Sequence, residues 1–529
     1  MYYGYLTNNI EQGESEGDGE FKLGENKIYT YILLMAGMKS LAKDTALYGM
    51  SSILGRLLNW LLVPLYVVKV NNTEFGEVTQ LYAWTALLLV FLTYGLETGF
   101  FRFSNADEQK DSRVVFTTCM TSLWATTSLF LGIIFLFITP ISSWLGFASS
   151  PEYIGIMAAI IGIDVMSSLP FAQLRLEKRP LRFASIKLLF VFLNIGFNLF
   201  FLVLCPDIYE DNSSWLSYVY SPERSGVFYI LLSNLIASSV MMLALFKQIF
   251  CVKYRLDKEL YGKIIRYSMP LLVSGVAGII NQTADKILFP MLTADQATAK
   301  ADLGIYGANF KFAVVMIMFI QAFRFAYEPF VFAGDRSLKN TSAYVKAMKY
   351  FVILGLFIFL SVGLFIQFLP AIPIAKDHID PAYFSGLAVV PIVMLAEFFF
   401  GVFFNLSFWY KLTDRTHWGA IFSTMGCMLT IALNVIFVPT YGYMACAWTA
   451  FTVYLIMMLA SYYIGKKNMP IKYEVSNGLS YFALALVLYG IGSYISLDNL
   501  WTKFIVSSAL VIVYMVVVGL RDFKQILRR

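Results

Sequence analysis

Charged residues, histidine and cysteine are all scarce in this chain of 529 residues. Asp, Glu, Lys and Arg together make up 14% of it, and only two histidines are present, His378 and His417. The five cysteines are scattered without a CxxC pair, so their expected role is small apolar packing rather than a disulfide or a metal site. No GxxxxGKS or GxxxxGKT phosphate loop occurs, which argues against ATP hydrolysis. We therefore expect neither a metal nor a cofactor.

Apolar residues dominate the rest of the chain. They form 58% of it, the mean hydropathy is +0.67, and runs of about 20 apolar residues, long enough to cross a hydrocarbon core about 30 Å thick, recur throughout. Runs such as TALLLVFLTYGL lack the two-residue alternation of a barrel strand, so we expect an all-α polytopic membrane protein. The fourteen expected transmembrane helices lie at 45–70, 78–101, 114–138, 153–171, 183–205, 227–250, 264–290, 304–331, 345–369, 385–410, 416–437, 443–464, 477–496 and 500–520.

Basic residues fall almost entirely into alternate loops. The loops of one side carry most of the Lys and Arg, whereas the other side holds only Lys69, Arg224, Lys300, Lys376 and Lys503. Because short loops rich in Lys and Arg stay in the cytoplasm, both termini are predicted to be cytoplasmic. The net charge of +6 follows from this topology and does not indicate nucleic-acid binding.

The first residues differ from the rest of the chain. GESEGDGE is acidic, glycine-rich and too polar to pack, so residues 1–38 are expected to form a disordered cytoplasmic tail. The segment lacks the basic start and apolar core of a signal peptide. Met35 and Met38 leave open a later natural start than Met1.

An internal repeat with an offset of about 230 residues relates two halves of the chain. Its matched positions are Pro64 with Pro290, Gly76 with Gly304, and Asn198 with Asn434. Six helices in each half give both the same orientation, and two such pseudo-symmetric lobes would enclose a central cavity suited to alternating access. The expected divisions are an N-terminal lobe at 39–255, a C-terminal lobe at 256–468, and two additional helices with the cytoplasmic C-terminus at 469–529. Chance similarity between apolar helices is the alternative explanation.

Ionisable residues deep within the expected spans are candidates for function, because charge in hydrocarbon is costly unless it faces protein or water. Arg56 and Asp164 lie at the same depth of the first lobe and form a hypothetical ion pair. Glu397 occupies the corresponding depth in the second lobe. A second hypothetical pair joins Asp285 and Lys311. Close packing of helices is the alternative role for the polar faces that carry these residues.

Other polar residues share helical faces with these charges. Asn59 lies on the face of Arg56, and Gln321 lies on the face of Arg324. Four long charged side chains lie near enough to span ends to reach the interface and are expected to be structural, namely Glu97, Lys187, Lys286 and Glu328. Among the deep residues the balance is basic, which suits a ligand that carries phosphate.

Three segments carry a family resemblance. They are KDTALYGMSSILGRLLNWLLVPLY, which opens the first half, YSMPLLVSGVAGIINQTADKILFPML, which opens the second, and NVIFVPTYGYMACAWTAF further along. Through them, residues 39–520 resemble the polysaccharide flippases, often called Wzx-type, of the multidrug, oligosaccharidyl-lipid and polysaccharide exporter superfamily. Such flippases carry undecaprenyl diphosphate-linked oligosaccharide units across the bacterial inner membrane for O-antigen, capsule or exopolysaccharide. The resemblance implies a secondary transporter and not an enzyme.

The resemblance also implies roles for the deep residues. The expected substrate-binding residues are Arg56, Asn59, Lys311, Gln321 and Arg324. The residues expected to couple a proton or sodium ion are Asp164, Asp285 and Glu397. Membrane lipid and polysaccharide assembly proteins are the other expected partners.

Two other functions stay open. A multidrug exporter of the same superfamily would favour an acidic, aromatic cavity, so the deep basic residues argue against it. A membrane-embedded polysaccharide polymerase would hold its catalytic groups in a large outer loop, whereas the expected outer loops here are short and poor in Arg and His.

Overall fold

The computed structural model describes residues 49, 53–105, 111–210, 218–333, 341–413, 415–495 and 499–527. The expected tail at 1–38 lies outside the described residues. The first expected helix is described as a helix at 53–60 that continues into α3 beyond a turn at Leu61.

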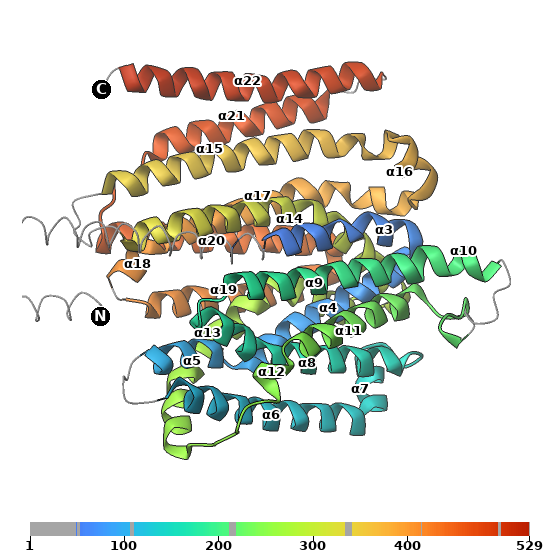
Figure 1. Ribbon diagram of the computed structural model, residues 1–529. Helices are drawn as coiled ribbons and strands as arrows, with labels where there is room; N and C mark the ends of the chain where they lie inside the picture. Colours follow the sequence, from blue (N-terminus) through green and yellow to red (C-terminus); the bar gives the residue numbers. More distant parts are fainter. Residues whose placement is uncertain are drawn as a thin grey trace, which may run out of the picture.

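Helices account for almost all of the secondary structure in these ranges (Figure 1). The first part of the chain forms α3 Leu62–Lys69, α4 Asn72–Thr93, α5 Leu96–Asn105, α6 Ser112–Leu136, α7 Ile138–Trp144, α8 Pro151–Leu176, α9 Pro180–Leu199, the π-helix η1 Phe200–Leu204, α10 Cys205–Glu210, α11 Gly226–Ala244 and α12 Phe246–Ile249. The second part forms α13 Lys258–Leu292, α14 Gln296–Ala333, α15 Thr341–Phe365, the 3-10 helix η4 Ile366–Ala371, α16 Pro373–His378, the 3-10 helix η5 Pro381–Ala388, α17 Val389–Leu406, α18 Phe408–Leu412, α19 His417–Tyr441, α20 Tyr443–Asn468, α21 Val475–Tyr494 and α22 Leu500–Leu527.

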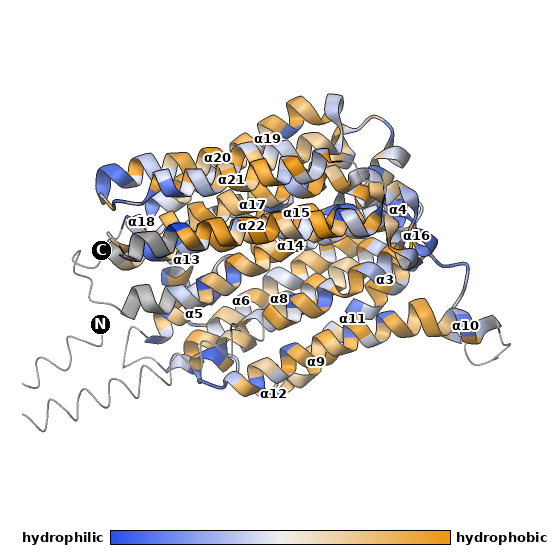
Figure 2. Cartoon of the chain, turned by 90° about the horizontal axis from the view of Figure 1, so that it is seen from above, coloured by the Kyte–Doolittle hydropathy of each residue, from blue (hydrophilic) through white to orange (hydrophobic). Residues whose placement is uncertain are grey.

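Thirteen helical segments among the described residues are long and apolar enough to cross a membrane. In chain order they match the second to the fourteenth helices expected from the sequence, which confirms the all-α polytopic fold. Figure 2 shows that apolar residues fill the length of the helices, with hydrophilic residues gathered toward the two ends. The end that carries Arg102, Lys178, Lys258, Lys349 and Lys466 is called the basic end below, and the end near α10 and α16 is called the opposite end.

The second expected helix is broken, because α4 and α5 are separated by Tyr94 and Gly95. Both residues have positive φ, 32° at Tyr94 and 71° at Gly95, a conformation that glycine adopts without steric cost. The break lies where α4 and α5 pass α13, and a Cβ at Gly95 would lie 3.2 Å from the carbonyl oxygen of Ser268. The chain therefore bends where it meets a neighbouring backbone.

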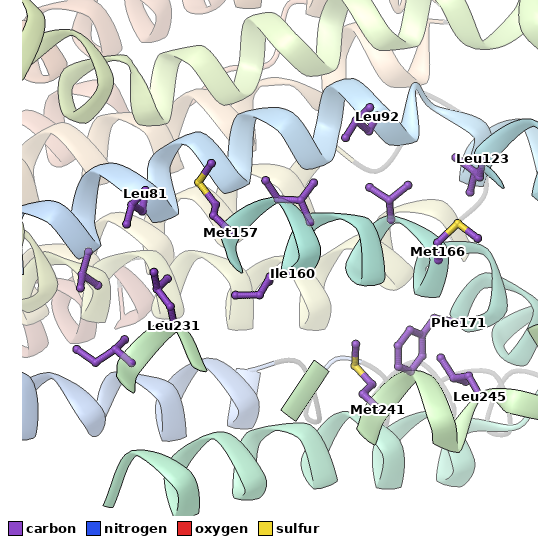
Figure 3. Packing of buried hydrophobic residues seen from close by; sticks show 14 of the residues in the cluster. Leu81, Leu92, Leu123, Met157, Ile160, Met166, Phe171, Leu231, Met241 and Leu245 are labelled. Carbon is purple, nitrogen blue, oxygen red and sulfur yellow. The ribbon is translucent and has the colours of Figure 1, made fainter. Parts of the chain in front are cut away.

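Buried apolar residues form two clusters. The first contains residues of α3 to α12 and the start of α13, together with Ile305 and Ala308 of α14 and Tyr383 of η5, and Figure 3 shows part of it between α4, α8 and α11. The second contains the end of α13 and residues of α14 to α22. Helix α13 contributes Ile264 to the first cluster and Phe289 to the second, so this long helix joins the two cores. Helices α21 and α22 lie at the edge of the bundle, where both pack against α15 (Figure 1).

Helices α4 and α14 cross at two glycines that the sequence repeat matches. A Cβ at Gly76 would lie 1.9 Å from the carbonyl oxygen of Lys300, and a Cβ at Gly304 would lie 1.8 Å from that of Asn72. Lys300 precedes Gly304 by four residues and Asn72 precedes Gly76 by four, so each helix makes the same contact on the other. Such reciprocity is the property of a two-fold contact, and only glycine permits it at this separation.

Candidate functional site

A cavity of about 370 Å³ lies between the helices of the two clusters. Its lining includes residues of the first helix and of α3, α4, α9, α11, α13, α14 and α17. Three of the residues expected from the sequence line it, namely Asn59, Lys311 and Glu397. Lys286 lines it as well. The sequence interpretation had placed Lys286 at the interface as a structural residue.

The cavity wall in the second half is built around Asp285 on α13. Its Oδ2 accepts hydrogen bonds from Lys286 Nζ at 2.8 Å and from Tyr306 Oη at 2.6 Å. The hypothetical pair between Asp285 and Lys311 is therefore wrong, and Lys286 is the partner. Lys286 Nζ also lies 3.8 Å from the ring centroid of Phe310 on α14, a cation–π contact. These contacts hold the ammonium group at the cavity wall.

Glu397 on α17 completes this wall. Glu397 is only 7% exposed, yet it lines the cavity. The exposed part of this residue therefore faces the space between the helices. Lys286 attracts this carboxylate and Asp285 repels it, which places the three charges in one electrostatic group. We call Asp285, Lys286, Tyr306 and Glu397 the second-half charge cluster.

Asn281 fixes the orientation of α13 behind this cluster. Its Nδ2 donates to the carbonyl oxygen of Ser423 at 3.1 Å, and its Oδ1 accepts from Thr430 Oγ1 at 3.1 Å. Tyr454 Oη donates to its backbone oxygen at 3.2 Å. Because a buried amide with satisfied hydrogen bonds holds a defined orientation, these contacts position Asp285 one turn further along.

The first half presents neutral polar groups to the same cavity. Asn234 on α11 donates from Nδ2 to Tyr82 Oη on α4 at 2.9 Å, and both residues line the cavity. Asp164 on α8 lies behind them, where its Oδ1 accepts from Ser238 Oγ at 3.2 Å. Asp164 itself is not among the residues that line the cavity.

The hypothetical pair of Arg56 with Asp164 is also wrong. Lys187 is the cation that interacts electrostatically with Asp164, and its Nζ lies 4.2 Å from the ring centroid of Phe171. Lys187 was expected to reach the interface instead. Arg56 interacts with Arg324, a like charge on α14.

A group of basic residues from the first helix, α14 and α18 lies toward the basic end. Arg324 Cζ lies 3.7 Å from the ring centroid of Phe404 on α17, and Lys411 Nζ lies 4.4 Å from the same centroid. With Arg56 they form what we call the basic cluster. The expected substrate-binding residues are thus divided, because Asn59 and Lys311 line the cavity and Arg56 and Arg324 do not.

The first helix and α14 lie side by side along this seam. Trp60 Nε1 donates to the carbonyl oxygen of Lys311 at 2.7 Å, and a Cβ at Gly49 would lie 2.9 Å from the ring of Phe325. Gln321 is half-buried on α14, one turn from Arg324, and is not among the cavity-lining residues.

A buried ion pair lies toward the opposite end, next to the part of α4 that lines the cavity. Lys300 Nζ lies 2.8 Å from Glu77 Oε1 and donates to the carbonyl oxygen of Gly146 at 2.7 Å. The two side chains are only 14% and 17% exposed. The pair joins α14 to α4 next to the Gly76–Gly304 crossing. The sequence interpretation assigned Lys300 to a loop. Glu77, which directly follows the matched Gly76, was the signal that could have identified the partner of Lys300.

Comparison with known families identifies the chain. Residues 41–327 match the family described as polysaccharide biosynthesis protein, and the match covers more than half of the chain. The chain belongs to this family. None of the curated proteins matches it.

Solved structures share the fold of this polysaccharide biosynthesis family member at low sequence identity. The structure titled "Lipid II flippase MurJ, inward closed conformation" has a TM-score of 0.70 at 14% identity, with 91% of this chain and 100% of that chain covered. An inward-facing multidrug resistance MATE family transporter of the MOP superfamily has a TM-score of 0.61 at 14% identity, with 80% and 94% covered. The chain thus shares its fold with a structure titled as a flippase and with one titled as a transporter. The protein is a multi-pass membrane protein of the polysaccharide biosynthesis family.

Proposed function

We propose that the protein flips undecaprenyl diphosphate-linked oligosaccharide units across the bacterial inner membrane for O-antigen, capsule or exopolysaccharide synthesis. The observation that carries the proposal is a polar, charged cavity at the junction of two apolar cores. A charged head group needs such a chamber, because it cannot cross hydrocarbon unaided. The family match to polysaccharide biosynthesis supports a glycan substrate.

Two lobes move against each other in this proposal. The lobes span 39–255 and 256–468, with two further helices at 469–529, and the basic end faces the cytoplasm. The reciprocal crossing of α4 and α14 supports a two-fold relation between them. Rocking of one lobe against the other would offer the cavity to each side in turn.

The basic cluster is the proposed entrance for the diphosphate. Arg56 and Arg324 interact despite their like charge, and a bound diphosphate would relieve that repulsion. Guanidinium groups bind phosphate oxygens through paired hydrogen bonds. In the proposed path, Lys311 and Asn59 then meet the head group inside the cavity, with Gln321 between the two sites.

Asp285 and Glu397 are the main proposed sites for a coupling proton or sodium ion, and Asp164 is the proposed secondary site in the first half. Glu397 is buried, negatively charged when ionised, and adjacent to Lys286 across the cavity wall. A proton or sodium ion at this carboxylate would change its attraction to Lys286. Such a change in pairing can bias one arrangement of the lobes over another.

The test replaces Arg56 or Arg324 by alanine in cells whose surface polysaccharide depends on this protein. Both variants should insert normally and lose surface polysaccharide by about tenfold or more, an effect equal to one lost charge-assisted phosphate contact. Lipid-linked oligosaccharide should accumulate on the cytoplasmic leaflet. Lys466→Ala, an exposed charge at the basic end, is the matched control. Normal polymer from both arginine variants would remove the proposal.

Drug export is the second candidate, because the fold is shared with multidrug resistance MATE transporters. Two lysines in the cavity, Lys286 and Lys311, oppose a cationic drug. Deletion of the protein should therefore leave susceptibility to cationic drugs unchanged. A sensitised strain with intact polysaccharide would favour drug export.

A further inference from the structure

A second cavity, of about 380 Å³, lies away from the central one, between α15, α17, α20 and α21. We call it the lateral slot. On α17 it is lined by Phe398, Phe399, Val402 and Leu406, whereas the preceding residue Glu397 lines the central cavity. Because successive helical residues are about 100° apart, these four residues lie on the face of α17 away from Glu397. The slot is therefore separate from the proposed transport site.

The slot opens sideways between α20 and α21. Helix α21 packs mainly against α15, while α17 packs against α20. The rim residues are exposed apolar or aromatic side chains, with Leu459 at 41% and Tyr463 at 66% on α20, and Val475 at 40% and Leu479 at 63% on α21. The floor is buried, as Phe398 at 3% shows. An apolar recess with this rim, on helices that cross a membrane, opens toward hydrocarbon chains.

The depth of the slot matches one leaflet. Its lining on α17 runs from Leu406 to Phe398, and on α21 from Val475 to Phe482. At 1.5 Å per residue each run extends about 12 Å. Half of a hydrocarbon core is about 15 Å. Because the slot begins at the basic end, it belongs to the leaflet at that end, whichever side of the membrane this is.

The mouth of the slot at the basic end carries two opposite charges. Lys349 Nζ on α15 lies 3.9 Å from Glu474 Oε2, which also accepts from Asn477 Nδ2 at 2.9 Å. Tyr462 and Tyr473 line the same region. In a lipid head group with a phosphate and an ammonium group, the phosphate would meet Lys349 and the ammonium group would meet Glu474. The two tyrosines lie at the depth where such residues usually contact the membrane interface.

We propose that the lateral slot binds a zwitterionic glycerophospholipid, with one acyl chain in the apolar recess, its phosphate at Lys349 and its ammonium group at Glu474. The chain fills the gap between α20 and α21 that the side chains leave. The lipid thereby completes the packing that attaches α21 and α22 to the rest of the bundle. This site is independent of the proposed substrate and of the direction of transport.

Native mass spectrometry of the full-length protein in detergent tests the proposal, with phosphatidylethanolamine and phosphatidylglycerol added in equal amounts. The unaltered protein should retain one phosphatidylethanolamine in preference to phosphatidylglycerol. Val402→Trp, which fills the recess, should reduce retention about tenfold. Ile436→Trp adds the same bulk to an exposed position of α19 and should retain the lipid. If Val402→Trp does not fold, Leu459→Trp at the rim replaces it.

The head-group contacts are tested by the paired change Lys349→Gln with Glu474→Gln. This variant should keep a lipid in the recess and lose the preference for phosphatidylethanolamine. Equal retention by the recess and control tryptophan variants would overturn the proposal. So would a preference of the unaltered protein for phosphatidylglycerol, or displacement of bound lipid only by a polyprenyl phosphate.

Discussion

The two sides of the central cavity contain matched helices but different chemistry. In the second half, charges form the cavity wall, because Lys286 and Glu397 line the cavity and Asp285 supports them. In the first half, Tyr82 and Asn234 form the wall, and Asp164 lies behind them. Corresponding depth in a sequence repeat therefore does not imply a corresponding role. We propose that the second half carries the main site of the coupling ion.

The largest effect on export should come from removing the carboxylate of Glu397, and the carboxylate of Asp164 provides the comparison. Glu397→Gln should abolish polysaccharide export, because the cavity loses its titratable group opposite Lys286. Asp164→Asn should lower export less than about threefold, because an amide can still accept from Ser238 and the residue does not face the cavity. Export is measured as surface polysaccharide per amount of inserted protein. Equal losses from the two variants would erase the distinction between the halves.

Asp285→Asn tests the same wall through its ion pair. Loss of the carboxylate leaves Lys286 buried without its partner, which costs about 3–5 kcal/mol. The variant should therefore lower the thermal midpoint as well as export. Asp285→Asn combined with Lys286→Met should recover stability and not export. Recovered export in the double variant would show that the pair is structural.

Alanine at each glycine of the α4–α14 crossing tests where the halves are truly equivalent. Gly76→Ala and Gly304→Ala should each cost about 1–3 kcal/mol, because both added methyl groups meet backbone that must move. Gly132→Ala is the matched control, since a Cβ there meets nothing within 4 Å. The thermal midpoints of the two crossing variants should fall by similar amounts. Damage from only one of them would contradict the reciprocal contact.

The ion pair at the opposite end should have a smaller effect. Glu77→Gln and Lys300→Met should each cost about 1–3 kcal/mol, because one buried partner loses its hydrogen bond. The double variant should cost less than the sum, as expected for contacting residues. In a background without reactive native cysteines, Thr79→Cys should react faster with a maleimide added from the opposite end when Glu77 is Gln. Unchanged labelling would mean that the pair does not close this end.

The smallest effect should come from the matched asparagines. Asn198 Nδ2 donates to the carbonyl oxygen of Asn194 at 2.7 Å, and Asn434 Nδ2 donates to that of Thr430 at 2.8 Å. Both side chains bond the residue four positions earlier and both are fully buried. Asn198→Ala and Asn434→Ala should each cost about 1 kcal/mol. If the two variants lower the thermal midpoint by unequal amounts, the matched hydrogen bonds do not contribute equally to stability.

The sequence predicted the order of the thirteen membrane-spanning helices that the structure describes, because runs of apolar residues are a property of the chain itself. It also paired Gly76 with Gly304, which lie together in the structure. It did not find the partners of Asp164 and Asp285. Depth along a helix can be read from sequence, but partner choice depends on how each helix is rotated about its axis.

Lys286 illustrates this limit. Its depth near the end of an expected span suggested that it reaches the interface, whereas the rotation of α13 places it at the cavity, where its ammonium group bonds the carboxylate of the neighbouring residue Asp285. The tertiary contacts of Asn281 set that rotation, and they come from residues about 140 to 170 positions later in the chain. The lateral slot was missed for the same reason, because it arises from the spacing of four helices.

The glycine crossing has a mechanical consequence. Two helices whose backbones meet at one point, with no side chains between them, can change their crossing angle by pivoting about that point. Helix α14 continues 29 residues past Gly304 to Ala333, which is a length of about 40 Å. A change of about 10° in the crossing angle at Gly304 would displace the far end of α14 by about 7 Å. A wide opening between the helices at the basic end thus needs only a small change of angle between α4 and α14 at the opposite end.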